Sequence, residues 1–428
     1  MNRMRITILC HFSNPLIREK IDLYPQWLHY RYRDFALWNT NIIEGLKKRD
    51  DIELHVISPH LGMRKKMQTF ESDGVHYYFF RAELPHPFGL IENHLFPQSN
   101  RNFPRNRRSV KEIIADIKPD LVNLIGAENA YYSITALDIE KIPLMVHLQT
   151  VYANPDRFKT GKVDKKRWEV ELLIFRKTPY MACTGRMYYD LVKGYNPDAI
   201  LFPRRWPASK FVDVPAVEKK YDFVYFARML NKNKGFDNAI EAMGLFVKKH
   251  PEIRFLAVGA RDSEWPLYEQ RIKELGLERN LEIHPPFPEY MDLLKYVKQA
   301  KFALLPITMD VLSGTILESI NMGMPVVTCR TSGTPSLNEK RETVLISDIG
   351  DSEALAQNIL RLYEDEALQE QLRENGRIYM KEREETNAHN IEVMVAQYKA
   401  VIDHYHNGTP IPKELLYDTD KNIDYRKK

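Results

Sequence analysis

Short apolar runs alternate with longer amphipathic stretches along most of the chain, and this alternation predicts an α/β protein. Residues 5–11, RITILCH, are rich in β-branched side chains and lack a polar face, which is typical of a buried parallel strand. A helix is predicted over residues 34–48, where apolar side chains recur at helical spacing. Further strands are predicted at residues 52–58, 75–81, 120–126, 144–148 and 180–184, with a helix at 168–176. The order of these elements favours a doubly wound sheet.

The pattern fails between residues 84 and 108, which are rich in Pro, His, Phe and Asn. Four basic residues there have no acid between them: Arg101, Arg105, Arg107 and Arg108. Two interpretations stay open for this segment. It is either a solvated basic loop, or a contact for an anionic acceptor or a lipid headgroup surface. Ser109 and Glu112 then form a capping-box pattern, which predicts a helix that begins at residue 109 and ends before Pro119.

A second α/β series follows a predicted linker at residues 200–214, which contain prolines and have no periodicity. Its predicted strands are residues 223–226, 253–258 and 281–284, and its predicted helices are residues 237–249, 268–275, 352–363, 366–374 and 387–405. We therefore predict an N-terminal domain at 1–205 and a C-terminal domain at 206–385. Residues 386–428 are predicted to form a helix that crosses back to the first domain, followed by a tail.

Composition and charge exclude several classes of protein. The chain has 428 residues, of which 44% are hydrophobic and 28% charged, as expected of a globular protein with two domains. A net charge of +4 does not indicate nucleic-acid binding. The 3 cysteines have no metal-ligand spacing, which favours a reduced, cytoplasmic setting. We find neither a signal-peptide pattern nor an apolar stretch of membrane-spanning length.

The segment with the clearest chemistry is residues 304–327, LLPITMDVLSGTILESINMGMPVV. A strand, a polar turn, a helix and a second strand make one βαβ unit. The helix start would present the amide groups of Ser313, Gly314 and Thr315 to an anion. One turn later, Glu318 could accept hydrogen bonds from ribose hydroxyls. The alternative is an ordinary crossover in which Ser313 only caps the helix.

Cations occur at the ends of neighbouring strands in the same half. Arg228 follows the strand predicted at 223–226, and Lys234 lies in the turn before the next helix. Gly259 ends the strand predicted at 253–258. Because parallel strands share one carboxyl edge, these residues and the helix start could together hold a diphosphate. Taken singly, Arg228 and Lys234 are better explained by surface solvation, and only their joint placement favours the diphosphate site.

The motifs FARMLNKNKGFDNAIEAM and DVLSGTILESINMGMPVV resemble the donor half of glycosyltransferase family 4. The resemblance is strongest over residues 221–362. It implies the GT-B fold, an α/β architecture of two Rossmann-like domains facing across a cleft, and a retaining transferase without a metal ion. Arg228 and Lys234 match the residues that bind the donor diphosphate, with a spacing one residue longer than usual. Glu318 matches the ribose-binding glutamate, and Asp310 stands where the family has a glutamate near the transferred sugar.

The first half departs further from that family. The Gly-rich turn expected after Cys10 is missing, and Gln149–Thr150 occupy the place of a common His-Asp pair. His147 lies on the preceding predicted strand, where we interpret it as a packed residue and not as a base.

The resemblance implies transfer of a sugar from a UDP- or GDP-linked donor to a glycan or lipid-linked acceptor, in the synthesis of cell-surface polysaccharide or glycoconjugate. Arg228, Lys234 and Asp310 are the catalytic candidates. Arg228, Lys234, Gly259, Ser313, Gly314, Thr315 and Glu318 are the donor-binding candidates. No metal and no nucleic acid are expected, and peripheral contact with the inner membrane face stays open. The alternatives are a sugar-nucleotide epimerase or hydrolase, and a nucleotide-sugar-binding protein without catalysis.

Overall fold

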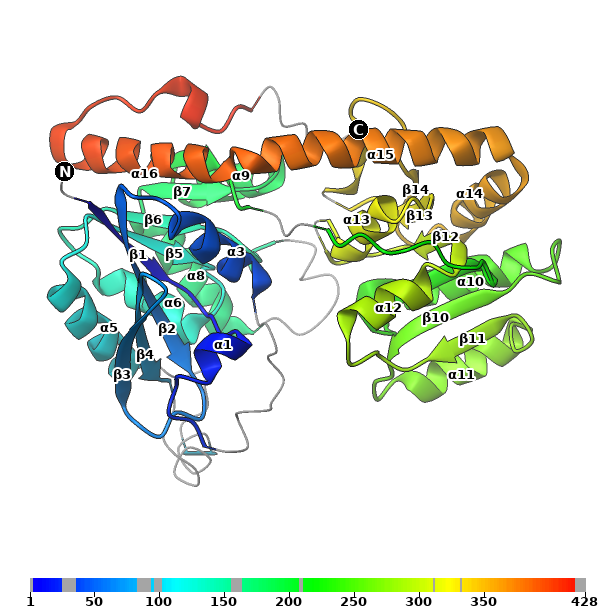
Figure 1. Ribbon diagram of the computed structural model, residues 1–428, viewed down its shortest axis with the longest axis horizontal. Helices are drawn as coiled ribbons and strands as arrows, with labels where there is room; N and C mark the ends of the chain where they lie inside the picture. Colours follow the sequence, from blue (N-terminus) through cyan, green and yellow to red (C-terminus); the bar gives the residue numbers. More distant parts are fainter. Residues whose placement is uncertain are drawn as a thin grey trace. The chain divides into compact units, whose positions relative to one another are not determined.

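The computed structural model describes residues 3–24, 36–82, 94–95, 102–154, 164–207, 211–310, 312–331 and 333–419. These residues fall into two compact units. Unit 1 contains the described residues of Met1–Ser209 and Asn387–Ile423, and unit 2 contains those of Lys210–Thr386. Each unit is built on its own sheet with helices on both sides (Figure 1).

The sheet of unit 1 has 8 strands in the order β3-β4-β2-β1-β5-β6-β7-β8. All neighbours are parallel except β3 and β4. The strands are β1 (Met4–Leu9), β2 (Ile52–His60), β3 (Met67–Ser72), β4 (Val75–Arg81), β5 (Leu121–Ile125), β6 (Leu144–His147), β7 (Tyr180–Cys183) and β8 (Ile200–Pro203). Because β2 and β5 lie on opposite sides of β1, the winding direction reverses between β1 and β5.

Helices cover both faces of this sheet. On one face, α3 (Leu37–Leu46) and α16 (Asn390–Asn407) contribute side chains such as Ile42 and Tyr398 to one apolar core with β1 and β2. Helix α5 (Pro104–Ile117) packs against β2 and β4. The remaining helical segments of the unit are α1 (Pro15–Arg18), α6 (Ala130–Ser133), η2 (Ile134–Asp138), α8 (Lys165–Lys177), α9 (Arg186–Tyr195) and η5 (Lys413–Leu415).

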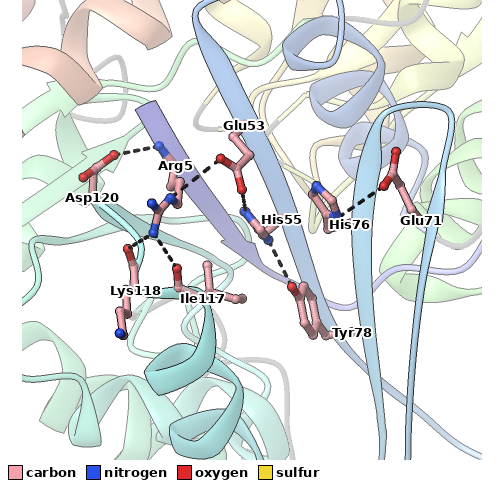
Figure 2. A network of polar contacts seen from close by, with 9 residues as sticks. All are labelled: Arg5, Glu53, His55, Glu71, His76, Tyr78, Ile117, Lys118 and Asp120. Carbon is pink, nitrogen blue, oxygen red and sulfur yellow. Dashed lines mark hydrogen bonds and ion pairs between the residues drawn. The ribbon is translucent and has the colours of Figure 1, made fainter. Parts of the chain in front are cut away.

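A polar network joins the amino ends of three strands to the end of α5 (Figure 2). The Arg5 backbone N–H donates to Asp120 Oδ2 at 2.7 Å, and its guanidinium donates to the carbonyls of Ile117 at 3.1 Å and Lys118 at 3.4 Å. Arg5 also lies 3.7 Å from Glu53. The last carbonyls of α5, which have no partner within the helix, are therefore satisfied by a cation.

The same network continues across the sheet to two stacked imidazoles. His55 lies 3.0 Å from Glu53 and 3.3 Å from the Tyr78 hydroxyl, and its ring stacks on His76 with centroids 4.8 Å apart (Figure 2). Burial lowers the pKa of His55 against the opposing effect of Glu53, so the ring is neutral at physiological pH.

The sequence prediction for the start of α5 is wrong. The helix begins at Pro104 and not at residue 109, and Ser109 is buried in its interior. Proline is favoured in the first turn, where its missing N–H is not needed, and the helix therefore starts at Pro104, upstream of the capping-box pattern. Arg105, Arg107 and Arg108 are therefore helical, whereas Arg101 lies outside the described residues. Arg107 pairs with Asp138 at 2.5 Å.

His147 is a packed strand residue, as predicted. Its Nδ1 lies 2.7 Å from Asn123 Oδ1, and Asn123 donates through Nδ2 to the Tyr398 hydroxyl at 2.6 Å. This chain of bonds links β6, β5 and α16. Burial lowers the pKa of His147 to about 3, so the ring is neutral and cannot serve as a base that gains a proton near neutral pH.

The sheet of unit 2 has 6 strands, all parallel, in the order β11-β10-β9-β12-β13-β14. The strands are β9 (Tyr221–Met229), β10 (Phe255–Ala260), β11 (Leu281–His284), β12 (Ala300–Leu305), β13 (Val326–Cys329) and β14 (Leu345–Ser347). One core contains side chains of α10 (Phe236–Phe246), α11 (Trp265–Glu274) and α14 (Ser352–Glu364). A second core contains side chains of α12 (Tyr290–Val297) and α13 (Gly314–Asn321).

Several other boundaries differ from the predictions. Residues 200–203, which were expected in a linker, form β8, because a proline at the end of an edge strand is compatible with pairing. The edge strands β3 and β14 and the helix α9 were not predicted. The helix predicted at 366–374 is longer, α15 (Glu366–Ala388). No helix among the described residues has the length and apolar character needed to cross a membrane.

Candidate functional site

The winding of unit 2 reverses between β9 and β12, and ligands of open α/β sheets bind at the carboxyl ends of strands beside such a reversal. Arg228 lies at the carboxyl end of β9, inside the strand and not after it as predicted. The 230–235 turn follows β9, and residues 306–313 follow β12. The predicted site residues of both segments therefore belong to this edge of the sheet.

The turn after β9 is held against the segment after β12. Gly235 has a φ of 77°, and a Cβ built on it would lie 1.8 Å from the Pro306 carbonyl oxygen. Thr308 Oγ1 lies 3.0 Å from the carbonyl oxygens of both Lys232 and Asn233, to which it can donate. Only glycine permits this approach of the two backbones. The turn that carries Lys234 is therefore placed by a contact between two βα units.

Lys234 and Asp310 form an ion pair. Lys234 Nζ lies 2.8 Å from Asp310 Oδ1 and 2.7 Å from Oδ2, and both side chains are 31% exposed. The Lys234 backbone is fixed as well, since its carbonyl accepts from the Tyr225 hydroxyl at 2.9 Å. A partly exposed pair of this kind contributes roughly 0–1 kcal/mol to stability. An arriving anion could therefore draw the ammonium away from Asp310 at small cost.

Arg228 differs from Lys234 in its surroundings. Its side chain is exposed and makes no hydrogen bond or ion pair with any residue that the structure describes. An unpaired guanidinium can offer its planar set of donors to a phosphate without first breaking another contact. Gly259 lies on β10, where a Cβ would be 2.6 Å from the Ala227 carbonyl oxygen, so this glycine permits close packing beside the Arg228 segment.

The start of α13 has the features of an anion site. Ser313 is the N-cap residue and is buried, yet its side chain does not cap the helix. Its hydroxyl lies 3.0 Å from the Thr315 hydroxyl instead. The expectation that the Ser313 side chain caps the helix is therefore wrong. Within the described part of the chain, no side chain caps the first amide groups of α13, which lie at the positive end of the helix dipole.

Glu318 lies one turn into the same helix and has a partner that the sequence reasoning missed. Its Oε1 accepts from the Tyr290 hydroxyl at 2.8 Å. Burial raises the pKa of Glu318, and the Tyr290 hydrogen bond opposes that rise. A Cβ on Gly314 would be 3.8 Å from Glu318 Oε1, so this carboxylate is close to the start of α13.

The structure thus brings only some of the predicted site residues into contact with one another. Lys234 contacts Asp310, Ser313 contacts Thr315, and Glu318 lies near Gly314, whereas within the described part of the chain no side-chain hydrogen bond or ion pair joins Arg228 to the other site residues. Tyr290 is a further residue of the candidate site, which the sequence analysis did not predict. The signal that could have found it is its position shortly after a parallel strand, at the same carboxyl edge as the other site residues.

In unit 1, polar side chains gather after β5 and β6. Arg167 donates to the Glu128 carbonyl and to Asn129 Oδ1, both at 2.6 Å, and its guanidinium lies 4.2 Å from the centre of the Tyr152 ring. Gln149 and Thr150 are half-buried in the segment after β6. No local pattern in the sequence indicates Arg167, because it lies far along the chain from the strand ends that it contacts.

A groove of about 480 Å³ lies between α5 and the segment before β6, and it is lined by Ile114, Lys118, Ile139 and Lys141 among others. Lys118 precedes β5 and Lys141 precedes β6, so the groove lies at the amino ends of these strands. That edge is opposite to the carboxyl ends, and the groove is not part of the candidate site. The described residues contain no cluster of His, Cys, Asp or Glu that could hold a metal ion.

Comparison with known proteins connects this site to a family. Residues 209–379 match the family described as glycosyl transferases group 1. A trehalose phosphorylase from Grifola frondosa is 27% identical over 193 residues, which are 41% of this chain and 24% of that protein. The capsular polysaccharide biosynthesis glycosyltransferase CapM from Staphylococcus aureus is 25% identical over 174 residues, 39% of this chain and 45% of the relative. The chain therefore spans less than half the length of these curated relatives.

Solved structures match over almost the whole chain. Sucrose-phosphate synthase from Thermosynechococcus elongatus superposes with a TM-score of 0.67 at 14% identity, covering 93% of this chain and 100% of that one. Anabaena HepE in complex with UDP gives a TM-score of 0.59 at 14% identity, covering 92% and 100%. At these identities the likeness shows the fold alone.

Proposed function

We propose, from the match of residues 209–379 to the group 1 glycosyltransferases and from the GT-B fold that the structural likenesses establish, that this protein is a retaining glycosyltransferase. Its donor would be a UDP- or GDP-linked sugar, and its acceptor a glycan or a lipid-linked glycan in the synthesis of cell-surface polysaccharide or glycoconjugate. The observation that carries the proposal is the joint placement of Arg228, Lys234 and the uncapped start of α13 at one edge of the unit 2 sheet.

In this mechanism the bond between the anomeric carbon and the diphosphate oxygen breaks, and a bond to the acceptor oxygen forms on the same face of the sugar. The acceptor proton passes to the departing diphosphate. Arg228, Lys234 and the amides of α13 stabilise the negative charge that develops on this leaving group. Glu318 accepts from the ribose, and no step requires a metal ion.

Because Lys234 and Asp310 form an ion pair, the contacts to the donor would form in a fixed order. The diphosphate attracts the Lys234 ammonium, and the carboxylate of Asp310 is then released to accept hydrogen bonds from the sugar. Asp310 is one methylene shorter than the glutamate that glycosyltransferase family 4 has near the transferred sugar. Its carboxylate would therefore contact a donor sugar that lies closer to the turn. In a membrane-linked reaction, the exposed Arg105 and Arg108 of α5 would face the headgroups at the cytoplasmic side.

Replacement of Asp310 by alanine is expected to strengthen binding of the nucleoside diphosphate product and to slow sugar transfer. Freed from its partner, Lys234 should bind the nucleoside diphosphate about fivefold more tightly, whereas kcat/KM for transfer should fall about 10- to 150-fold, the value of a hydrogen bond to a charged group. Calorimetry and initial rates measure the two effects. Unchanged product affinity would contradict the competition between Asp310 and the diphosphate, and Asp310→Glu tests whether the usual side-chain length is tolerated.

Donor binding should weaken at mildly acidic pH. Burial raises the pKa of Glu318 above its ordinary value of 4.5, and only the ionised carboxylate offers both of its oxygens purely as acceptors, because protonation turns one of them into a donor. Affinity for the nucleoside diphosphate should therefore fall as the pH drops through this raised pKa, at a pH above that at which an exposed glutamate titrates. Folding stability should change with pH in the opposite direction to donor affinity. Because the pKa of Glu318 is raised in the folded state, its stabilising contribution to the free energy of unfolding is fully present below pH 4.5 and is lost as the pH rises through the raised pKa.

Titration of the dissociation constant between pH 5 and 8 for the wild type and for Glu318→Gln checks this prediction, with roughly the same buffer ionic strength throughout. The glutamine variant retains the phosphate titration of the ligand but not that of residue 318. Equal pH profiles for the two proteins would remove Glu318 from the ribose contact.

A thermal-shift screen of nucleotide sugars tests the proposed function directly, because a ligand that binds only the folded state raises the apparent melting temperature. We expect a shift with UDP-sugars or with GDP-sugars, followed by transfer to a glycan acceptor with retention. Consumption of the donor without acceptor would instead indicate an epimerase or hydrolase. Binding without turnover on a broad acceptor panel would indicate a nucleotide-sugar-binding protein, and no shift with any nucleotide sugar would refute all three.

A further inference from the structure

Tyr290 combines two properties that packing alone does not explain. The residue is 49% exposed, although its hydroxyl is committed to a partner. That partner is Glu318 Oε1, at 2.8 Å. Tyr290 thus presents an apolar ring to solvent beside the carboxylate that is proposed to bind the ribose.

The segment that carries Tyr290 is held by an aromatic cluster. His284 and Phe287 stack with ring centroids 4.2 Å apart and planes 6° apart, and Phe287 lies 5.0 Å from the Tyr296 ring. His284 ends β11 and Tyr296 lies on α12, so the turn between them is fixed at both ends. Tyr290 is the first residue of α12 and is therefore placed by a rigid support at the carboxyl edge of the sheet.

We propose that Tyr290 is a nucleoside-binding residue, whose hydroxyl orients the Glu318 carboxylate toward the ribose and whose ring stacks on the nucleobase. This inference rests on the proposed function, since it assumes that Glu318 binds a ribose. The class of ligand is a nucleoside diphosphate.

The geometry supports both roles. One oxygen of Glu318 is occupied by Tyr290, which leaves Oε2 and the second lone pair of Oε1 for ribose hydroxyls. The furanose ring carries the hydroxyls and the base on neighbouring carbons. An aromatic ring bonded to the same carboxylate is therefore within reach of the base. Stacking is tolerant of base identity, so the discrimination between bases would come from groups at the ring edge, and the affinity from Tyr290.

Two substitutions separate the roles. Tyr290→Leu removes the ring and the hydroxyl but keeps an apolar side chain, and should weaken binding of UDP or GDP about 5- to 150-fold, which corresponds to the 1–3 kcal/mol of one base–aromatic stack. Tyr290→Phe keeps the ring and should retain nucleoside diphosphate affinity within about threefold. It should, however, lower the preference for the ribonucleotide over its 2′,3′-dideoxy analogue several-fold, because the Glu318 carboxylate loses its orientation.

Calorimetric titration of the full chain with UDP, GDP, their dideoxy analogues and inorganic pyrophosphate is the experiment. Pyrophosphate affinity should be the same in both variants and the wild type, which shows that the phosphate site has folded. Tyr405→Leu, a change at an exposed tyrosine of unit 1, is the control and should alter no affinity. Unchanged nucleoside diphosphate affinity in Tyr290→Leu, or an equal loss for pyrophosphate, would overturn the role of Tyr290. Failure of the wild type to bind either UDP or GDP would overturn the proposed function and this inference together.

Discussion

Replacement of Arg228 by alanine is expected to lower kcat/KM for sugar transfer about 30- to 900-fold, which corresponds to a loss of roughly 2–4 kcal/mol of transition-state stabilisation. The guanidinium would contact the diphosphate as the bond to the sugar breaks, when the leaving group gains negative charge. The Arg228 side chain has no hydrogen bond or ion pair within the described part of the chain. The free energy of unfolding should therefore change by less than about 0.5 kcal/mol, as for most exposed sites.

The matched control for this prediction is Arg279→Ala. Arg279 is also exposed on unit 2, but it lies in the turn before β11, at the amino edge of the same sheet. Both variants remove one positive charge, so an effect of net charge on donor attraction would appear in both. Only Arg228→Ala should lose transfer. An equal fall in the two variants, or an unchanged rate in Arg228→Ala once a donor is known, would exclude a contact between Arg228 and the leaving group.

The sequence predicted the βαβ unit around Glu318 because its signals are local. Apolar runs define β12 and β13, and Gly323 and Pro325 end α13 within a few residues. The same reasoning could not predict the contacts that complete the site. Lys234 and Asp310 are 76 residues apart, and Tyr290 and Glu318 are 28 apart. Each pair joins two βα units, so it depends on strand order and not on any local pattern.

The errors in unit 1 have a similar cause. A proline in the first turn and a capping box compete as helix-start signals, and the sequence alone does not rank them. The structure does so by burying Ser109 and the apolar face of α5 against β2 and β4. Residues 200–214 are predicted to be a linker because they carry two prolines and lack periodicity, yet pairing with β7 makes residues 200–203 a strand. Tertiary contacts outweigh local propensity in both cases.

Among the predicted substitutions, Gly235→Ala should have the largest effect on the free energy of unfolding. Gly235→Ala should reduce the free energy of unfolding by roughly 2–5 kcal/mol, the sum of about 1–2 kcal/mol for a left-handed backbone with a Cβ and about 1–3 kcal/mol for the steric overlap. The overlap is severe because the new Cβ would lie 1.8 Å from the Pro306 carbonyl oxygen, which is backbone and cannot rotate away. To relieve it, the Lys234 turn and the segment after β12 must separate, so donor affinity should fall as well.

Gly276→Ala isolates the two contributions. Gly276 has a φ of 70°, close to the 77° of Gly235, but no atom lies within 4 Å of a Cβ built there. It should therefore lose only the backbone term of about 1–2 kcal/mol and keep its donor affinity. Urea unfolding followed by calorimetric titration of the nucleoside diphosphate measures both properties. If the two variants were equally stable and bound equally well, the contact between the two βα units would not position Lys234. A selective loss in Gly235→Ala would instead show that the phosphate site depends on backbone packing as much as on its charged side chains.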